Sequence, residues 1–248
     1  METFYEWFLV LYEDTGINLP FLYDDYDRGR ILNGLWTTIK LSFTCVLFSV
    51  IIGMVGAWLQ GSPWKLTRRV VNFYVQLFRN TPPLVQLYFF YFAVGILIPR
   101  VENDWGGTSP LIDSFGWAVI SLSFFAGAFN VEIFRSGIEA VPKSTIEAAK
   151  ALGFSRLQIY KDITLPLAIR VVIPSLNNNL VNLVKTTTLA YAIAVPELLY
   201  ESNQIWSDNV NVTEMMLFLL FAYFILVGIL VWAMNSWDRS LKIPGFGQ

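Results

Sequence analysis

The sequence predicts an all-α, polytopic membrane protein with about five transmembrane helices. Hydrophobic residues make up 55% of the 248-residue chain, charged residues make up only 15%, and the mean hydropathy is +0.51. Soluble domains have about 45–50% apolar and about 25% charged residues. Five apolar stretches also follow one another along the chain, each close to the roughly 20 residues that a helix needs to cross a bilayer. The composition therefore favours a helical bundle embedded in a membrane.

Residue usage also limits the chemistry that the chain can perform. Cys45 is the single cysteine, and there is no histidine. A single cysteine excludes a disulfide framework within the chain and a cysteine-based metal site. The absence of histidine removes the commonest general base and the commonest metal ligand. We therefore expect no catalytic residue, no metal site and no cofactor bound by this chain.

Residues 1–33 precede the apolar stretches and are aromatic and acidic. They hold seven Asp or Glu residues against Arg28 and Arg30. We expect an N-terminal periplasmic or interfacial segment over 1–33 and a transmembrane domain over 34–248. A short amphipathic helix lying in the membrane interface is predicted from Phe4, Trp7, Phe8, Val10 and Leu11.

The five predicted spans occupy most of the remaining chain. The first carries one charge, Lys40, near its outer end, and a partly apolar elbow over 70–78 near the inner surface precedes the second. The spans are predicted over Leu35–Leu59, Thr81–Ile98, Gly116–Ile138, Leu167–Val195 and Glu214–Met234.

The distribution of Lys and Arg predicts the orientation of these spans. Cytoplasmic connections carry an excess of both residues near the span ends. The connection after the first span and the loop after the third are basic, whereas the opposite side holds only Arg28, Arg30 and Arg100. We therefore expect an outer N-terminus and a cytoplasmic C-terminus. The basic residues of the two cytoplasmic connections are Lys65, Arg68, Arg69, Arg79, Lys143, Lys150, Arg156 and Lys161.

The loop over about 140–166 contains the most informative stretch, EAAKALGFSRLQIYKDITLP. Ser144 and Glu147 have the S-x-x-E spacing of a helix capping box, and Ser155 and Gln158 have the S-x-x-Q form. Gly153 lies between them, where a helix end requires a left-handed backbone. The pattern predicts a short helix, a tight turn and a second short helix.

This stretch resembles the EAA loop of bacterial ABC importer permeases, which docks into the ATPase subunit. LFRNTPPLVQ and IFRSGIEAVPKS further resemble the polar amino acid permeases of the histidine and glutamine type, and the resemblance runs from about Gly34 to the C-terminus. The chain departs from that family with Asn80 for the usual glycine and with KTTTL where K-D-T-S-L is common. The positions that match the loop are Glu147, Ala148, Ala149, Gly153, Ile163, Leu165 and Pro166.

The resemblance implies an ATP-driven importer of a polar amino acid in the bacterial cytoplasmic membrane. The chain has no G-x-x-x-x-G-K-[ST] phosphate-binding loop, so ATP and magnesium are expected on a partner ATPase dimer. The resemblance also implies a second permease chain, identical or related, and a separate amino acid-binding protein outside the membrane, with no nucleic acid partner. The C-terminal DRSLKIPGFG is similar to glutamate/aspartate permeases and favours an acidic substrate.

Two alternatives remain open for Glu147 and for the fourth span. Glu147 can cap its helix, contact the ATPase, or do both. Asn178, Asn182 and Lys185 fall at i, i+4 and i+7 on one helical face, with Thr186 beside it. That face can line a translocation path, or it can hold helices together by hydrogen bonds and an ion pair of Lys185 with Glu132. Glu132 can equally pair with Arg135, three residues on.

Two other classes of membrane protein compete with the importer. A membrane-embedded enzyme is disfavoured by the missing histidine and the single cysteine. A secondary transporter working without an ATPase often consists of two repeated halves, and the five spans show no such repeat.

Overall fold

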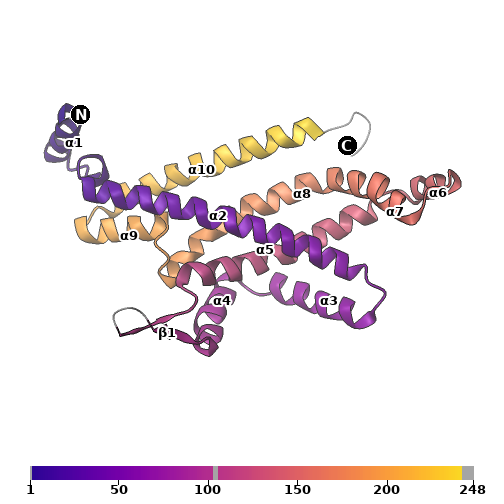
Figure 1. Ribbon diagram of the computed structural model, residues 1–248. Coiled ribbons are helices and arrows are strands. Elements are labelled where there is room, and N and C mark those ends of the chain that lie inside the picture. Colours follow the sequence, from indigo (N-terminus) through magenta and orange to yellow (C-terminus); the bar gives the residue numbers. More distant parts are fainter. Residues whose placement is uncertain (1, 103–105, 242–248) are drawn as a thin grey trace. The chain divides into compact units, whose positions relative to one another are not determined.

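The computed structural model describes residues 2–102 and 106–241, almost all of them in helices (Figure 1). A short antiparallel hairpin, with Arg100 opposite Pro110, interrupts them on the side expected outside. The elements are α1 (Glu2–Thr15), η1 (Pro20–Leu22), α2 (Asp25–Gln60), α3 (Lys65–Arg79), α4 (Pro83–Tyr88), η2 (Phe89–Val94), η3 (Gly95–Leu97), β1 (Arg100–Glu102), β2 (Thr108–Pro110), α5 (Ser114–Glu139), α6 (Lys143–Ala151), α7 (Arg156–Gln158), η4 (Ile159–Thr164), α8 (Leu165–Thr186), η5 (Thr187–Ile193), α9 (Leu198–Asn209) and α10 (Val212–Leu241).

Four helical stretches of the described chain are long and apolar enough to cross a membrane. They are Asp25–Gln60, Ser114–Glu139, Arg156–Ile193 and Val212–Asp238. They contain the first, third and fifth predicted spans whole and most of the fourth. The second predicted span corresponds to the shorter apolar helix Pro83–Leu97, so a count of five crossings stays a prediction.

The first long helix begins earlier than its apolar stretch. α2 starts at Asp25, with Asp25 and Asp27 in its first turn, where negative charge favours a helix N-terminus. It then continues without a break to Gln60. The boundary expected between residues 33 and 34 therefore lies inside α2, and the acidic segment supplies the first turns of that helix.

The second apolar stretch is broken because Pro82 and Pro83 cannot donate the backbone hydrogen bonds of a continuous helix. α3 ends at Arg79, and α4 is only six residues long before a π-helical segment and a 3-10 turn follow. The side-chain amide of Gln86 donates to the carbonyl oxygen of Phe78 at 2.8 Å and to the hydroxyl of Thr81 at 2.7 Å. One glutamine therefore ties the two sides of the break together.

The elbow predicted over 70–78 is part of one regular helix, α3, that packs along α5. Val71 and Val75 form a buried cluster with Val131. The Tyr74 hydroxyl donates to the carbonyl oxygen of Phe124 at 2.6 Å. Since Phe124 is the eleventh residue of the 26-residue α5, this bond places Tyr74 of α3 beside the middle of α5.

The chain divides into two compact units, each built from several separate segments. The first comprises Met1–Thr44, Leu87–Val119 and Val184–Ile229. Its buried apolar cluster joins Ile31 of α2 to Leu198 and Ile205 of α9 and to Met215 and Leu219 of α10. The N-terminal part of α2 is therefore held by segments far along the sequence.

The second unit comprises Cys45–Gln86, Ile120–Leu183 and Leu230–Gln248. Its helices approach closely at glycines: a Cβ at Gly53 would overlap the Asn130 Cβ, and one at Gly56 would overlap a methyl of Val131. Small residues allow helix backbones to pack tightly where the hydrophobic effect offers no drive between helices. These two positions of α2 therefore require glycine.

Candidate functional site

The loop of the EAA pattern forms a helix, a left-handed turn and a second helix, as predicted. α6 ends in a Schellman motif: Phe154 N–H donates to the Ala149 carbonyl at 3.1 Å, and Gly153 N–H donates to the Lys150 carbonyl at 3.0 Å. Gly153 itself has a φ of 83°. Residues with a side chain rarely adopt this φ without strain, so glycine at position 153 allows the turn that the sequence predicted.

One of the two predicted capping boxes is present and the other is wrong. Ser155 caps α7: Gln158 N–H donates to the serine hydroxyl at 3.4 Å, and Ser155 N–H donates to the glutamine side chain at 2.9 Å. Ser144 does not cap α6, because the N-cap is Pro142 and the helix starts at Lys143. Ser144 is then the second helical residue, and Glu147 loses its capping role.

Several apolar side chains of this segment, α6 to η4, face away from the chain. Leu152 is 78% exposed and Leu157 is 74% exposed. Glu147, Ala148, Gly153, Leu165 and Pro166 are exposed as well. A solvated loop has no use for such exposed leucines, so the segment has the character of an interaction surface. We call α6, α7, η4 and the residues joining them the coupling segment.

Two of the pattern's positions are packed inside the chain. Ala149 is buried and Ile163 is partly buried. Ala149 is therefore not available at the surface, whereas Ala148 and Ala151 are exposed. Pro166 is the second residue of α8, in the first turn, where a missing N–H costs little.

The polar face of α8 divides into exposed and buried amides. Asn178, Asn182 and Lys185 are exposed, and Thr186 is partly exposed. The Lys185 side chain forms no ion pair with any residue that the structure describes. Helical spacing puts the three exposed residues on one stripe of α8. A lysine without a counter-charge in an apolar span is costly unless a cavity, water or a ligand meets it.

Neighbouring asparagines hold helices of the second unit together. The Asn179 amide donates to the side-chain oxygen of Asn130 in α5 at 2.8 Å, and Asn130 donates to the Ser49 hydroxyl in α2 at 3.3 Å. Asn177 donates to the Met234 carbonyl of α10 at 3.4 Å. Asn177 and Asn179, next to the exposed stripe, therefore form hydrogen bonds between helices.

Glu132 pairs within the second unit, as its spacing to Arg135 allowed. Its carboxylate lies 2.9 Å from the Arg135 guanidinium and 3.7 Å from that of Arg79. Arg135 also contacts Glu139 at 2.9 Å. Glu132 is thus neutralised by two arginines, and the alternative partnership with Lys185 is not needed to compensate its charge.

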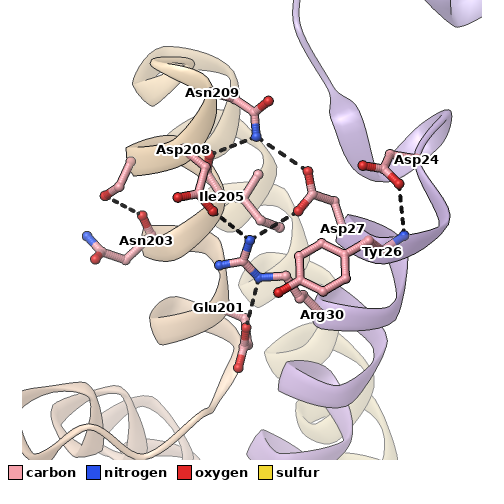
Figure 2. A network of polar contacts seen from close by, with 10 residues as sticks. Asp24, Tyr26, Asp27, Arg30, Glu201, Asn203, Ile205, Asp208 and Asn209 are labelled. Atoms are coloured by element: carbon pink, nitrogen blue, oxygen red, sulfur yellow. Dashed lines mark hydrogen bonds and ion pairs between the residues drawn. The ribbon is translucent and has the colours of Figure 1, made fainter.

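A polar network that the sequence did not indicate lies in the first unit (Figure 2). Arg30 of α2 contacts three carboxylates: Asp208 at 2.8 Å, Asp27 at 3.2 Å and Glu201 at 3.3 Å. Its guanidinium also lies 5.4 Å from the centre of the Tyr26 ring. Because Glu201 and Asp208 lie in α9, one arginine locks α9 to the start of α2.

Glu197 is a buried carboxyl at the N-terminus of α9, in the connection between η5 and α10. It accepts hydrogen bonds from the N–H groups of Leu199 at 3.0 Å and Tyr200 at 2.8 Å, and from the Tyr223 hydroxyl at 2.8 Å. Only 1% of the residue is exposed, and burial raises the pKa of its carboxyl to about 7. The sequence did not indicate this site, because a glutamate before a helix is common and its burial against Tyr223 is visible only in the fold.

Among the described residues no cluster of three or more His, Cys, Asp or Glu side chains has an arrangement that could hold a metal ion. Trp105 and Lys242 lie outside the described residues, as does most of the C-terminal DRSLKIPGFG.

Comparisons with known proteins agree on one family. Residues 38–243 match the model for the binding-protein-dependent transport system inner membrane component. A putative glutamine transport system permease protein of Rickettsia conorii is 34% identical over 202 residues, covering 79% of this chain and 86% of the relative. The glutamate/aspartate import permease protein of Escherichia coli is 26% identical over 219 residues, covering 88% of this chain and 89% of the relative.

The fold has solved counterparts as well. The crystal structure of an amino acid ABC transporter with histidines contains a chain of 26% identity and TM-score 0.77, covering 90% of this chain and 99% of that one. A chain of the inward-facing MetNI methionine ABC transporter has 23% identity and TM-score 0.69, with 89% of this chain and all of that chain covered. At 23% identity, the similarity to the methionine transporter chain shows a shared fold only.

Proposed function

The chain belongs to the family of binding-protein-dependent transport system inner membrane components, transport permeases and not enzymes, and on that premise we propose that it carries a polar amino acid into the cell. In this proposal it is the membrane-spanning subunit of an ATP-driven importer in the bacterial cytoplasmic membrane, with the N-terminus outside and the C-terminus inside. The observation that carries it is the coupling segment, a rigidly turned polar loop with exposed leucines between two apolar helices.

The coupling segment is proposed to dock on a partner ATPase dimer that binds ATP and magnesium. Gly153 keeps the turn narrow, Leu152 and Leu157 supply apolar contact, and Glu147 supplies a charge at the exposed surface. Ala148 lies in the same exposed surface, whereas Ala149 and Ile163 support it from inside. Leu165 and Pro166 join the segment directly to α8. A movement of the segment is therefore transmitted to the helix that carries the polar stripe.

The translocation path is proposed to run along the exposed stripe of α8. Asn178 and Asn182 offer amide donors and acceptors, Thr186 offers a hydroxyl, and Lys185 offers a positive charge to an amino acid carboxylate. Binding of a carboxylate would meet the charge that no described side chain compensates. The stripe needs a facing surface, which a second permease chain, identical or related, would provide.

A separate amino acid-binding protein is proposed to deliver the substrate from outside. The relatives' names point to glutamine and to glutamate or aspartate. A positive Lys185 suits any α-carboxylate and does not choose between these substrates. The chain's own sequence favours an acidic substrate through its C-terminal similarity to glutamate/aspartate permeases.

The test is to purify the chain at native expression level and to identify its co-purifying subunits by mass spectrometry. An ATPase and a second permease copy or relative are expected. The same preparation, reconstituted with its binding protein, should take up labelled glutamine or glutamate only with ATP. Uptake that proceeds without any ATPase subunit would contradict the proposal and favour a secondary transporter.

A further inference from the structure

A groove of the second unit has Tyr160 of the coupling segment in its wall. Its volume is about 460 Å³, within the size range of sites that enclose a small-molecule ligand. Its walls are the end of α2 and the connection to α3 (Ala57–Leu59 and Gly61–Pro63), Ile138 of α5 and Tyr160 of η4. Nearly all of these side chains are apolar, so the groove suits a hydrocarbon ligand.

Three basic residues follow the groove wall along the chain. α3 begins two residues after Pro63 and carries Lys65, Arg68 and Arg69 in its first turns, all of them exposed or partly exposed. None of the three forms an ion pair with a described residue. The sequence contains no Asp or Glu between Asp27 and Glu102. The three charges therefore lack an acidic neighbour along the chain and suit an anion.

The surface around the groove has the composition of a membrane interface. Trp58 and Trp64 are 71% and 73% exposed, and tryptophan is enriched at the level of the lipid headgroups. Leu66, Val70, Phe73 and Leu77 of α3 are also exposed, at a spacing that puts them on one side of the helix. Groove-lining residues, exposed tryptophans and basic residues without a described ion pair thus follow one another along residues 57–69.

We propose that this groove binds an anionic phospholipid of the inner leaflet. One acyl chain lies along the apolar walls, and the phosphate contacts Lys65, Arg68 and Arg69. Basic pockets on the cytoplasmic side of helical bundles bind acidic headgroups by the same chemistry. This proposal rests on the cytoplasmic placement of the α2–α3 connection, which the proposed function also assumes. Lipid binding can nevertheless be measured without transport, so the two proposals can fail separately.

Occupancy of the groove would also reach the coupling segment. Tyr160 forms part of the wall and belongs to η4, between the exposed turn at Gly153 and the start of α8. A bound acyl chain would fill the space beside this ring. The lipid is thereby placed to stabilise the position of the coupling segment against α2 and α5.

The test is a native mass spectrometry titration of the full purified chain, with its co-purified subunits, in a neutral detergent. Dioleoylphosphatidylglycerol should bind at least about tenfold more tightly than dioleoylphosphatidylcholine. The triple variant Lys65→Gln, Arg68→Gln, Arg69→Gln should lose about tenfold to a hundredfold of the phosphatidylglycerol affinity, since each basic residue near an anionic lipid contributes favourably. Equal affinity for the two lipids overturns the proposal.

A matched control removes the same charge from the same side of the chain. Lys143→Gln, Lys150→Gln, Arg156→Gln lies in the coupling segment, outside the groove walls; ATPase docking is expected to weaken in it, but the permease chain should bind phosphatidylglycerol as the unchanged chain does. Equal losses in both triple variants would mean diffuse attraction and would overturn the site. Glycerol 3-phosphate, the headgroup without acyl chains, should fail to compete at the same concentration; full competition would show that the groove plays no part.

Discussion

Among single residues, Glu197 has the most unusual environment outside the long apolar helices. Two backbone N–H groups and the Tyr223 hydroxyl donate to its carboxylate, and such bonds ordinarily lower a carboxyl pKa. Burial outweighs them and raises the pKa from 4.5 to about 7. The negative charge of Glu201 contributes in the same direction. The carboxyl is therefore held near its titration point at neutral pH.

This pKa predicts a pH dependence of stability. Between about pH 4.5 and pH 7 the folded protein holds a proton on Glu197 that the unfolded chain has lost, so the contribution of this residue to stability falls as the pH rises. In the Glu197→Gln variant this fall disappears, and its stability relative to the unchanged protein should rise by on the order of 3 kcal/mol from pH 5 to pH 8.

Thermal unfolding of both proteins in detergent at several pH values measures the difference. The pH slope decides the matter, because the lost hydrogen bonds shift the variant by a constant amount at every pH. Glu147→Gln, at an exposed carboxyl, controls for the removal of one negative charge. Parallel pH curves for Glu197→Gln and the unchanged protein would mean that Glu197 stays ionised throughout.

Lys185 offers a second prediction at this scale. Lys185→Met keeps most of the side-chain length and the helix while it removes the charge. Uptake should fall by about one to two orders of magnitude, because a charge-assisted hydrogen bond to a carboxylate is worth roughly 1.5–3 kcal/mol. The yield of the assembled protein should stay normal, since Glu132 has Arg135 and Arg79 as partners. Uptake of the labelled amino acid and complex yield are the two measurements.

The double variant Lys185→Met, Glu132→Gln distinguishes a role of Lys185 in the translocation path from a role in neutralising Glu132. If Glu132 needs Lys185 in addition to its two arginines, Lys185→Met alone lowers the yield because a partly buried carboxylate loses counter-charge, and the double variant restores the yield. Lys40→Met is the control, because Lys40 is an exposed lysine in another span that lies over the Trp36 ring at 5.9 Å. Normal uptake and normal yield in Lys185→Met would contradict both roles.

At the scale of elements, the coupling segment depends on the turn at Gly153. A β-branched residue is poorly accommodated at a φ of 83°. Gly153→Val should leave the protein inserted but reduce ATPase co-purification and uptake several-fold. Gly153→Asn, which tolerates a left-handed backbone, should retain most of both. A Cβ at Gly153 meets no atom within 4 Å, so the loss in the valine variant comes from the turn and from the docking surface, not from a clash within the chain.

Gly228→Val is the matched control for this prediction. A Cβ at Gly228 would also meet no atom within 4 Å, but this glycine lies in α10 without a positive φ. ATPase co-purification and uptake should be unchanged there. Full uptake by Gly153→Val would show that the turn is not the element that couples the chain to the ATPase.

The elements also show how far the sequence could predict the fold. Long apolar stretches without proline indicated the positions of α2, α5 and α10, because length and hydropathy alone determine such helices. The turn at Gly153 was predictable because its residues satisfy a local motif. The start of α6 was not, since Pro142 and Ser144 both suit a helix start and the backbone has the proline as its N-cap. The division between Asn178 and Asn179 was equally hidden, because the partners of Asn179 lie on another helix.

At the scale of the whole chain, contacts between distant segments are what sequence patterns do not reveal. Arg30 bonds residues that lie 171 and 178 positions away. Asn211 likewise donates to the Asn18 carbonyl at 2.9 Å and ties the start of α10 to the segment before α2. Each partner alone is an ordinary polar residue near a span end. Only the fold shows that they hold α9 and the N-terminal ends of α2 and α10 together.

The orientation of the chain in the membrane can be tested with introduced cysteines. The asymmetry of Lys and Arg predicts that the α2–α3 connection and the coupling segment lie in the cytoplasm and the β1–β2 hairpin outside. Ser62→Cys and Ser144→Cys should therefore react with an impermeant thiol reagent only after the cells are opened. Ser109→Cys should react in intact cells. The native Cys45 is fully buried, so the unchanged protein should remain unlabelled and serves as the background. Labelling of Ser144→Cys in sealed cells would contradict the predicted orientation, because the coupling segment would then lie outside, where a cytoplasmic ATPase could not bind it.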